Sequence, residues 1–272
     1  MNKNNTKIIL ITGGSSGIGK KLAHDLLRRG ETVVIISHDQ SRLATAEQEL
    51  RAVSPRVRAI LCDIRNTEDV QRAVAQILEE FGRLDVLVNN AGYAVYRAFE
   101  ESSIDEVLDI VDVNLLGVIR CTKAVIPSMK ARGIGQIVNI SSIGGTMIIT
   151  PNSSYCASKH GVVALSEALS YELEPFGISI SVICPGRVET PFFDHETFRT
   201  RVTRPETQLT VSIDAVSTAI IRAIETRQFM TFVPWYLGLL SWTFHAMPWL
   251  VKPLYGMLLR SRIRSLYTTA RR

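Results

Sequence analysis

Short apolar segments recur along the chain, and each of them ends at a glycine or a polar residue. They span residues 7–12, 32–37, 59–62, 84–88, 136–140 and 178–183. Continuous apolar runs of this length predict strands that are buried on both faces of a parallel sheet. The other apolar positions follow helical periodicity, over residues 20–29, 67–81, 104–130, 155–176 and 213–226. This alternation predicts βαβ units with right-handed crossovers, and therefore an α/β fold with a doubly wound parallel sheet.

The first apolar segment leads into a glycine-rich turn, residues 13–19, with the sequence Gly-Gly-Ser-Ser-Gly-Ile-Gly. Glycine lets the backbone approach a pyrophosphate, and the free N–H groups and dipole of a helix start favour negative charge. The turn therefore predicts an anion site for a dinucleotide. Its spacing from Gly13 is Gly-x-x-x-Gly-x-Gly, which departs from the usual Gly-x-Gly-x-x-Gly pattern. An ordinary tight turn, the alternative, would need only one glycine.

The end of the second apolar segment bears on the choice of cofactor. In dinucleotide-binding folds, an acidic residue at this point accepts a hydrogen bond from the ribose 2′-hydroxyl of NAD. This chain has Ser37 and His38 there, followed by Asp39. The missing acid favours NADP(H) over NAD(H), with His38 or Arg42 near the 2′-phosphate. Asp39 lies close enough to support the opposite choice.

Polar residues follow the later strands as well. Asp63 and Ile64 come after the third strand, Asn89 ends the fourth, and Ser142 follows the fifth. Ligands of such sheets bind beyond the carboxyl ends of the strands, so we expect these residues at one edge, with the Asp63 carboxylate at an adenine amino group. Asn114 lies among apolar neighbours and must find hydrogen-bond partners. Bonds to the backbone of its own helix would be the ordinary explanation.

Tyr155 and Lys159 stand four residues apart in a helical pattern, which places them on one face of the helix. A phenol has a pKa of about 10, and a neighbouring cation stabilises the phenolate and lowers that value. The pair is therefore a candidate general acid/base. Taken alone, the motif has an alternative explanation: both residues could simply lie on an exposed helix face.

Length and composition limit the possible organisation. A chain of 272 residues favours one large domain with an appendage, which we assign to residues 1–228 and 229–272. The net charge of +5 comes largely from the final turns, which indicates a local contact with an anionic surface and not nucleic-acid binding. The four scattered cysteines have no metal-ligand spacing, so we expect free thiols and no metal. The polar N-terminus carries no export signal, so we expect a cytoplasmic location.

The segment over residues 229–259 is apolar and carries all three tryptophans, with prolines at positions 234, 248 and 253. Its apolar run over residues 235–251 contains His245 and ends at Lys252-Pro253, so it is shorter than the about 20 apolar residues that a spanning helix needs. Aromatic residues followed by clustered arginines are typical of a helix that lies on the cytoplasmic face of a membrane. The alternatives are a helix that covers a lipophilic cleft and a contact between subunits. Residues 191–208, rich in charge and aromatic side chains, are expected to form a mobile lid.

The chain resembles the short-chain dehydrogenase/reductase family over about residues 6–228. The resemblance rests on six motifs in the family's order and approximate spacing. They are residues 12–19, Asn89-Asn90-Ala91-Gly92, Asn114, Ser142, Tyr155-x-x-x-Lys159 and Pro185-Gly186-x-Val188-x-Thr190. The family's fold, which the chain is expected to share, is a single Rossmann domain.

The resemblance implies four catalytic residues. Tyr155 would donate a proton to a substrate carbonyl, and would act as the base in the reverse oxidation. Lys159 would lower the pKa of Tyr155 and hydrogen-bond the nicotinamide ribose, and Ser142 would polarise the carbonyl oxygen. Asn114 would hold a water in a proton relay that ends on Lys159.

The resemblance also implies a cofactor site. Together with Tyr155 and Lys159, its predicted members are Gly13, Ser15, Ser16, Gly17, Ile18, Gly19, Ser37, His38, Arg42, Asp63, Ile64, Asn89, Ala91, Gly92, Pro185, Gly186, Val188 and Thr190. Asn89 would lie on the adenosine ribose side, and Val188 and Thr190 would meet the carboxamide. Members that use NADP often have arginine where His38 stands, and members that use NAD often have aspartate where Ser37 stands; this chain has neither.

These inferences predict an NADPH-dependent reductase of a lipophilic ketone or aldehyde in lipid metabolism, such as a long-chain acyl, sphingoid or steroid-like compound. We expect a homo-oligomer, and a membrane contact through residues 229–272. One alternative is a soluble NAD-dependent alcohol dehydrogenase whose apolar tail packs between subunits. The other is a dinucleotide-binding sensor or scaffold without turnover, which the complete set of catalytic residues disfavours.

Overall fold

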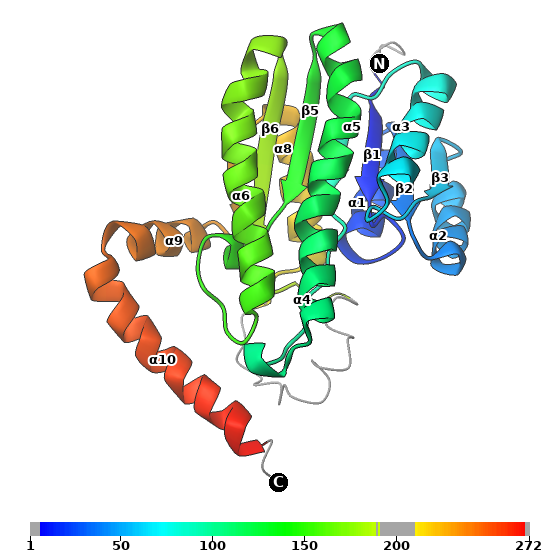
Figure 1. Ribbon diagram of the computed structural model, residues 1–272. Coiled ribbons are helices and arrows are strands. Elements are labelled where there is room, and N and C mark those ends of the chain that lie inside the picture. Colours follow the sequence, from blue (N-terminus) through cyan, green and yellow to red (C-terminus); the bar gives the residue numbers. More distant parts are fainter. Residues whose placement is uncertain (1–5, 189, 191–209, 270–272) are drawn as a thin grey trace.

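The structure, a computed structural model, describes residues 6–188, 190 and 210–269, and their side chains except those of residue 258 and of residues 261–269. Its centre is a sheet of seven parallel strands in the order β3-β2-β1-β4-β5-β6-β7 (Figure 1). The strands are β1 (Ile8–Thr12), β2 (Thr32–Ser37), β3 (Val57–Leu61), β4 (Val86–Asn89), β5 (Gly135–Ile140), β6 (Ile178–Pro185) and β7 (Met230–Val233). The predicted doubly wound α/β fold is confirmed. The lid predicted over residues 191–208 lies outside the described residues.

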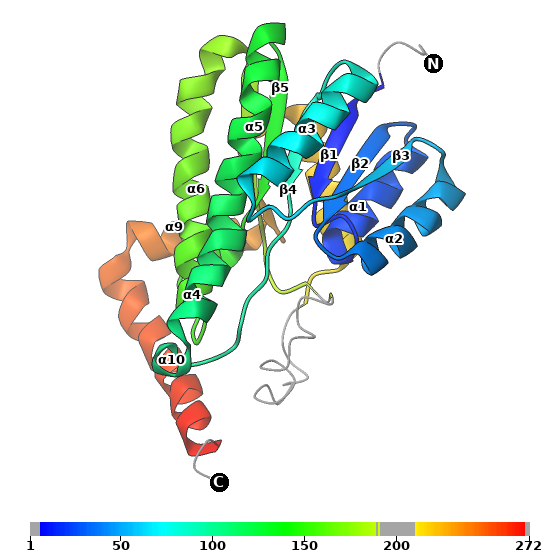
Figure 2. The same cartoon turned by 45° about the vertical axis from the view of Figure 1, so that its right-hand side comes forward.

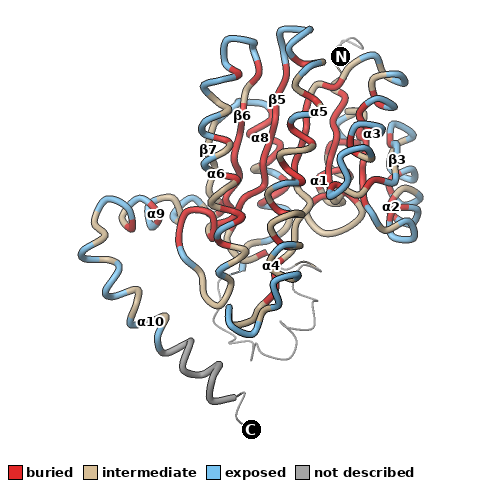
Figure 3. Tube along the Cα trace, in the orientation of Figure 1, coloured by how far each residue is buried: buried red, intermediate tan, exposed pale blue. Residues whose placement is uncertain are grey.

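Helices cover both faces of the sheet. The α-helices of the described residues are α1 (Gly17–Arg28), α2 (Gln40–Val53), α3 (Thr67–Phe81), α4 (Ile104–Val111), α5 (Gly117–Arg132), α6 (Ser153–Leu173), α8 (Ile213–Thr226), α9 (Tyr236–Ala246) and α10 (Pro248–Thr269). Helices α1, α2 and α8 contribute to the core on one face, and α3, α5 and α6 to the core on the other. The inner strands β1, β2, β4, β5 and β6 are buried between these two layers (Figure 3), whereas the edge strands β3 and β7 are partly exposed.

The continuous apolar runs follow from this double coverage. Within β1, Ile9 and Ile11 enter the core on one face, whereas Ile8 and Leu10 enter the core on the other. Successive side chains of a strand point to opposite faces, so both sets of positions must be apolar.

The sheet also defines where a ligand can bind. Strand β1 pairs with β2 on one side and with β4 on the other, so the order of the strands reverses between β1 and β4. In open parallel sheets the crevice beyond the carboxyl ends of the strands at such a point is the usual binding site.

Three features differ from the predicted organisation. Residues 104–130 are not one regular helix, because a π-helical turn at Asp112–Leu116 separates α4 from α5. Helix α2 has no counterpart among the predicted helices; it buries only Leu43, Ala46 and Leu50, which leaves a weak periodic pattern. The domain boundary expected at residue 228 falls too early, because β7 lies beyond it and pairs with β6 as the last strand of the sheet.

Helices α9 and α10 lie outside the two layers. Helix α9 follows β7 directly, and α10 projects past the end of the body at which the strands terminate (Figures 1 and 2). Among the described residues, no helix combines the length and the hydropathy that a membrane span requires.

A chain of polar side chains crosses the core at the end of β4. The Asn89 amide donates to Asn139 Oδ1 at 2.8 Å and to Thr122 Oγ1 at 3.2 Å, and the Asn139 amide donates to Ser166 Oγ at 2.8 Å. All four side chains are buried. Asn89 therefore connects β4 to β5 and α5, and the expectation that it contacts an adenosine ribose is wrong. Its neighbour Asn90 faces the crevice instead.

We predict that Asn89→Ala lowers the free energy of unfolding by about 1–3 kcal/mol, because it leaves buried partners without a donor. Urea denaturation followed by circular dichroism measures this change. Ser179→Ala is the matched control, since the Ser179 hydroxyl is buried and has no hydrogen-bond partner among the described residues; its effect should stay within about 0.5 kcal/mol. Equal losses in the two variants would contradict a structural role for Asn89.

A candidate active site at the carboxyl ends of the strands

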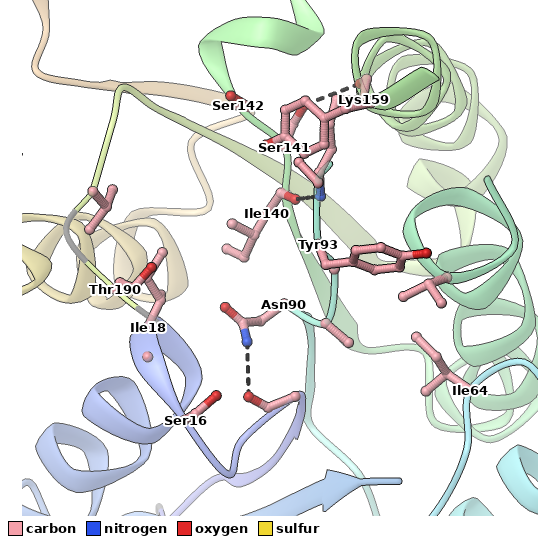
Figure 4. A pocket seen from close by; sticks show the side chains of 18 of the residues that line it. Ser16, Ile18, Ile64, Asn90, Tyr93, Ile140, Ser141, Ser142, Lys159 and Thr190 are labelled. Atoms are coloured by element: carbon pink, nitrogen blue, oxygen red, sulfur yellow. Dashed lines mark hydrogen bonds between the residues drawn. The ribbon is translucent and has the colours of Figure 1, made fainter. Parts of the chain in front are cut away.

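A cavity of about 890 Å³ opens at the carboxyl ends of the strands. It is lined by most of the predicted site residues, which lie at the ends of strands β1 to β6 or in the segments that follow them. These residues, several of which are labelled in Figure 4, are Gly13, Ser15, Ser16, Gly17, Ile18, Ser37, His38, Arg42, Asp63, Ile64, Ala91, Gly92, Ser142, Tyr155, Lys159, Pro185, Gly186, Val188 and Thr190. Three predicted residues do not line it: Gly19, Asn89 and Asn114.

The glycine-rich turn between β1 and α1 has the geometry of an anion site. Gly13 and Gly17 adopt positive φ angles of 64° and 53°, which favour glycine. A Cβ atom on Gly13 would lie 2.9 Å from the Ala91 Cα atom. Helix α1 begins at Gly17 with no acidic residue in its first turn, and the Ser16 side chain does not cap it, so its first N–H groups are suited to binding a pyrophosphate.

Gly19, in the first turn of α1, packs against the backbone of this glycine-rich turn. A Cβ atom at Gly19 would lie 2.5 Å from the Gly13 carbonyl oxygen and 2.6 Å from the Asn90 amide nitrogen. The Asn90 amide in turn donates to the carbonyl oxygens of Thr12 and Gly13, at 3.0 and 3.2 Å. Gly19 therefore permits close packing and does not face the cavity, which corrects its assignment as a contact residue.

Of the residues that were expected to select the cofactor, Asp39 and Ser37 make hydrogen bonds within the protein, whereas His38 is exposed at the rim of the cavity. Asp39 caps α2: its carboxylate accepts from the Arg42 backbone N–H at 3.0 Å and from the Ser41 hydroxyl at 2.9 Å. These hydrogen bonds hold the pKa of Asp39 below its usual value. Ser37 is buried and accepts from the Ser15 hydroxyl at 3.0 Å, whereas His38 is exposed at the rim of the cavity.

An ionic cluster that the sequence did not predict adjoins Asp63. The Arg65 guanidinium donates to both Asp63 carboxylate oxygens and, at 2.8 Å, to Asp109 Oδ1. Tyr93 donates from its hydroxyl to Asp109 Oδ2 at 2.5 Å. The pKa of Asp63 lies below its usual value, chiefly because of Arg65. Since all four residues line the cavity, an adenine amino group would share Asp63 with Arg65.

Ser142, Tyr155 and Lys159 come together where β5 ends beside α6. Ser142 Oγ accepts from the Gly144 N–H at 3.0 Å and hydrogen-bonds with Tyr155. Lys159 is only 4% exposed, and its ammonium donates to the Ile140 carbonyl oxygen at 2.9 Å (Figure 4). The ammonium lies 5.9 Å from the centre of the Tyr155 ring.

Burial shifts the ionisation of this pair. Burial raises the pKa of Tyr155 to about 12, although the hydrogen bond with Ser142 acts in the opposite direction. Burial lowers the pKa of Lys159 to about 8. The predicted lowering of the Tyr155 pKa by Lys159 does not outweigh burial in this structure. At neutral pH the site therefore contains a protonated phenol beside an ammonium group, which suits donation of a proton.

Asn114 is fully buried in the π-helical turn. Its Oδ1 accepts from the Tyr93 N–H at 2.9 Å, and its amide donates to the Tyr93 carbonyl at 2.9 Å and to Ser158 Oγ at 3.2 Å. These partners lie outside the helix that carries Asn114, so the alternative that Asn114 bonds to the backbone of its own helix is wrong. A Cβ atom on Gly92 would lie 2.8 Å from Asn114 Oδ1 and 3.3 Å from Lys159 Nζ. Asn114 therefore supports the wall of the cavity next to Lys159.

Comparison with known proteins gives relatives that are named as reductases. Ketoacyl reductase HetN of a Nostoc species is 37% identical over 221 residues, which cover 81% of this chain and 76% of the relative. A 3-ketodihydrosphingosine reductase of Bacteroides thetaiotaomicron is 41% identical over 189 residues, which cover 70% of this chain and 66% of the relative.

Solved structures with a similar fold include two that contain a nicotinamide cofactor. Actinorhodin polyketide ketoreductase with NADPH superimposes with a TM-score of 0.80 at 33% identity, over 88% of this chain and 99% of that one. A short-chain dehydrogenase/reductase from Burkholderia phymatum in complex with NAD gives a TM-score of 0.80 at 29% identity, over 90% and 95%. The sequence model of the family described as short chain dehydrogenase matches residues 7–199. The chain therefore belongs to the short-chain dehydrogenase/reductase family, whose members act on carbonyl or alcohol groups with a nicotinamide cofactor.

Proposed function

We propose that this chain reduces a lipophilic ketone or aldehyde to the alcohol with NADPH, and that its substrate is a long-chain acyl, sphingoid or steroid-like compound. The observation that carries the proposal is the pairing of Ser142 with a protonated Tyr155 at the wall of the cavity. Two hydroxyl groups placed in this way can both donate to one carbonyl oxygen. Relatives named as reductases of ketoacyl compounds and of 3-ketodihydrosphingosine support a ketone of this class.

The residues of the site divide the work of the reduction. Tyr155 donates its phenol proton to the oxygen of the substrate carbonyl, while Ser142 holds the same oxygen by a hydrogen bond. Lys159 stabilises the phenolate that remains, through its positive charge. The bound nicotinamide supplies the hydride. Asn114 fixes the backbone of Tyr93, and the predicted relay water would be held next to this position.

The preference for NADPH rests on how Asp39 is engaged. Its carboxylate caps α2 and pairs with the Arg42 side chain at 3.2 Å, so turning it toward a ribose 2′-hydroxyl would break the cap. His38 and Arg42 remain at the rim of the cavity as partners for a 2′-phosphate. The alternative, an NAD-dependent alcohol dehydrogenase, would require Asp39 to leave this cap.

We extend the proposal to location and assembly. The protein acts on the cytoplasmic face of a membrane, which it contacts through residues 229–272. It also forms a homo-oligomer, for which the exposed apolar side chains of α4 provide support: Ile104 is 68% exposed and Leu108 is 58% exposed.

We predict that Tyr155→Phe lowers kcat for reduction of a 3-oxoacyl thioester by about 10²–10⁴-fold, because the proton donor is lost. The measurement is NADPH consumption, followed by absorbance. Binding of NADPH, measured separately by calorimetry, should stay within about threefold, since the pyrophosphate site is unchanged. Tyr171→Phe, at an exposed position of α6, is the control. Unchanged turnover in Tyr155→Phe would instead favour a sensor or scaffold without catalysis.

We predict that removing the basic side chains at the rim weakens NADPH binding selectively. The double variant His38→Ala/Arg42→Ala should raise the Kd for NADPH by about 10–100-fold, as expected for lost hydrogen bonds to a charged group. The Kd for NADH should change little. Arg51→Ala is the control, because Arg51 lies in the last turn of α2. Equal weakening of both cofactors, or tighter binding of NADH than of NADPH by the unaltered chain, would contradict the proposed preference.

A further inference from the structure

We infer that the C-terminal arm, defined as residues 235–260, adsorbs to an anionic lipid surface and borders the mouth of the cavity. The inference names the lipid surface as the place where the enzyme takes up a lipophilic carbonyl compound. For the identity of that substrate it rests on the proposed function. The adsorption itself depends only on the arm.

The arm exposes an unusual amount of apolar surface. Trp235, Trp242 and Trp249 follow one another at intervals of seven residues and are 77%, 63% and 73% exposed. Further exposed apolar side chains accompany them: Leu239, Leu240, Leu250, Leu254 and Met257. Clustered exposure of this kind marks a site of contact with a protein or a membrane.

The charge of this region favours an anionic lipid as the partner. Residues 229–272 contain six lysines and arginines and neither aspartate nor glutamate, whereas residues 1–228 contain 25 basic and 26 acidic residues. The excess positive charge of the chain therefore lies in this region. Lys252 and Arg260 are both exposed on α10. Tryptophans that accompany lysine and arginine are typical of helices that lie in the plane of an anionic membrane surface.

The exposed side chains lie along α9 and α10, which are held against the body. A Cβ atom on Gly238 would lie 2.9 Å from the Phe232 ring, so α9 packs closely on β7. Phe244 is buried, and its ring meets that of Tyr255 edge to face at 5.6 Å, which joins α9 to α10. The arm therefore has one face anchored to the protein and another that faces solvent.

The anchored face touches the walls of the cavity. A Cβ atom on Gly186, which lines the cavity, would lie 3.0 Å from Leu237 of α9. The Tyr255 hydroxyl of α10 donates to the Ile148 carbonyl oxygen at 2.7 Å. The next two residues, Ile149 and Thr150, line the cavity. Figures 1 and 2 show α10 at the same end of the body as the carboxyl ends of the strands, so a lipid surface against the arm lies next to the cavity.

Flotation with lipid vesicles tests the arm. The full chain should float with vesicles of phosphatidylcholine and phosphatidylserine, and bind more weakly to phosphatidylcholine alone. The double variant Trp242→Ser/Trp249→Ser should lower the partition coefficient by at least about 10-fold, because two large apolar side chains lose their burial. Tyr171→Ser is the matched control, since this aromatic residue is 70% exposed on α6, outside the arm. In the double variant Lys252→Gln/Arg260→Gln, the partition coefficient should fall about fivefold for each charge removed. This loss should occur only on the vesicles that contain phosphatidylserine.

Two results would overturn the inference: a full chain that does not float, or tryptophan variants that float as well as the control. If the tryptophan variants turned a dimer into a monomer in sedimentation velocity and the full chain did not float, the arm would be a subunit contact instead. Flotation needs no ketone, so its outcome is independent of catalysis. A chain that floats but consumes no NADPH with any ketone would refute the proposed function and leave adsorption standing.

Turnover tests the link to the substrate. With a ketone embedded in vesicles, Trp242→Ser/Trp249→Ser should lose rate in proportion to the lost adsorption. With a short, water-soluble ketone its rate should equal that of the unaltered chain. Equal rates on the embedded ketone would overturn the assignment of the lipid surface as the place of uptake.

Discussion

The burial of the Lys159 amine next to the Tyr155 phenol is the constraint on which the site depends. A charged group removed from water is destabilised unless polar partners surround it. The end of β5 provides such a partner, because the Ile140 carbonyl accepts from the ammonium, while the Ser141 hydroxyl donates to the carbonyl of Lys159. Gly92 leaves room for Asn114 on the other side. The end of β5 and helix α6 thus hold the Tyr155–Lys159 pair in a buried position, and this burial shifts the pKa of both groups.

The same architecture separates the tasks of the protein. The turn after β1 and the ends of β2 and β3 form the part of the cavity suited to a dinucleotide, and the end of β5 with α6 forms the part suited to proton transfer. Helices α9 and α10 adjoin the cavity from a third direction through Leu237 and Tyr255. On our proposal, a lipophilic substrate would therefore meet the catalytic hydroxyls from the side of the arm, while the cofactor occupies the crevice between β1 and β4.

The sequence predicted the features that depend on local pattern, namely most of the strands, the glycine turn and the Tyr155–Lys159 pair. It failed where a side chain chooses between neighbours that are distant in the sequence. Asn89 and Asn90 are adjacent, and only the pleat of β4 decides that Asn89 faces the core. The Arg65–Asp109 pair joins residues 44 positions apart, for which the pattern gives no signal. Strand β7 was missed because it is only four residues long and merges with the apolar segment that follows.

The pH dependence of kcat/KM for NADPH in the reduction tests the account most directly, because this parameter reports ionisation in the free enzyme. Burial lowers the pKa of Lys159 to about 8, so the ammonium is present below that pH and is lost above it. Burial raises the pKa of Tyr155 to about 12, so the phenol keeps its proton throughout. We predict that kcat/KM stays level at neutral pH and falls above about pH 8. A value that rises from about pH 6 to pH 8 would contradict the account, because it would mean that reduction requires a deprotonated group.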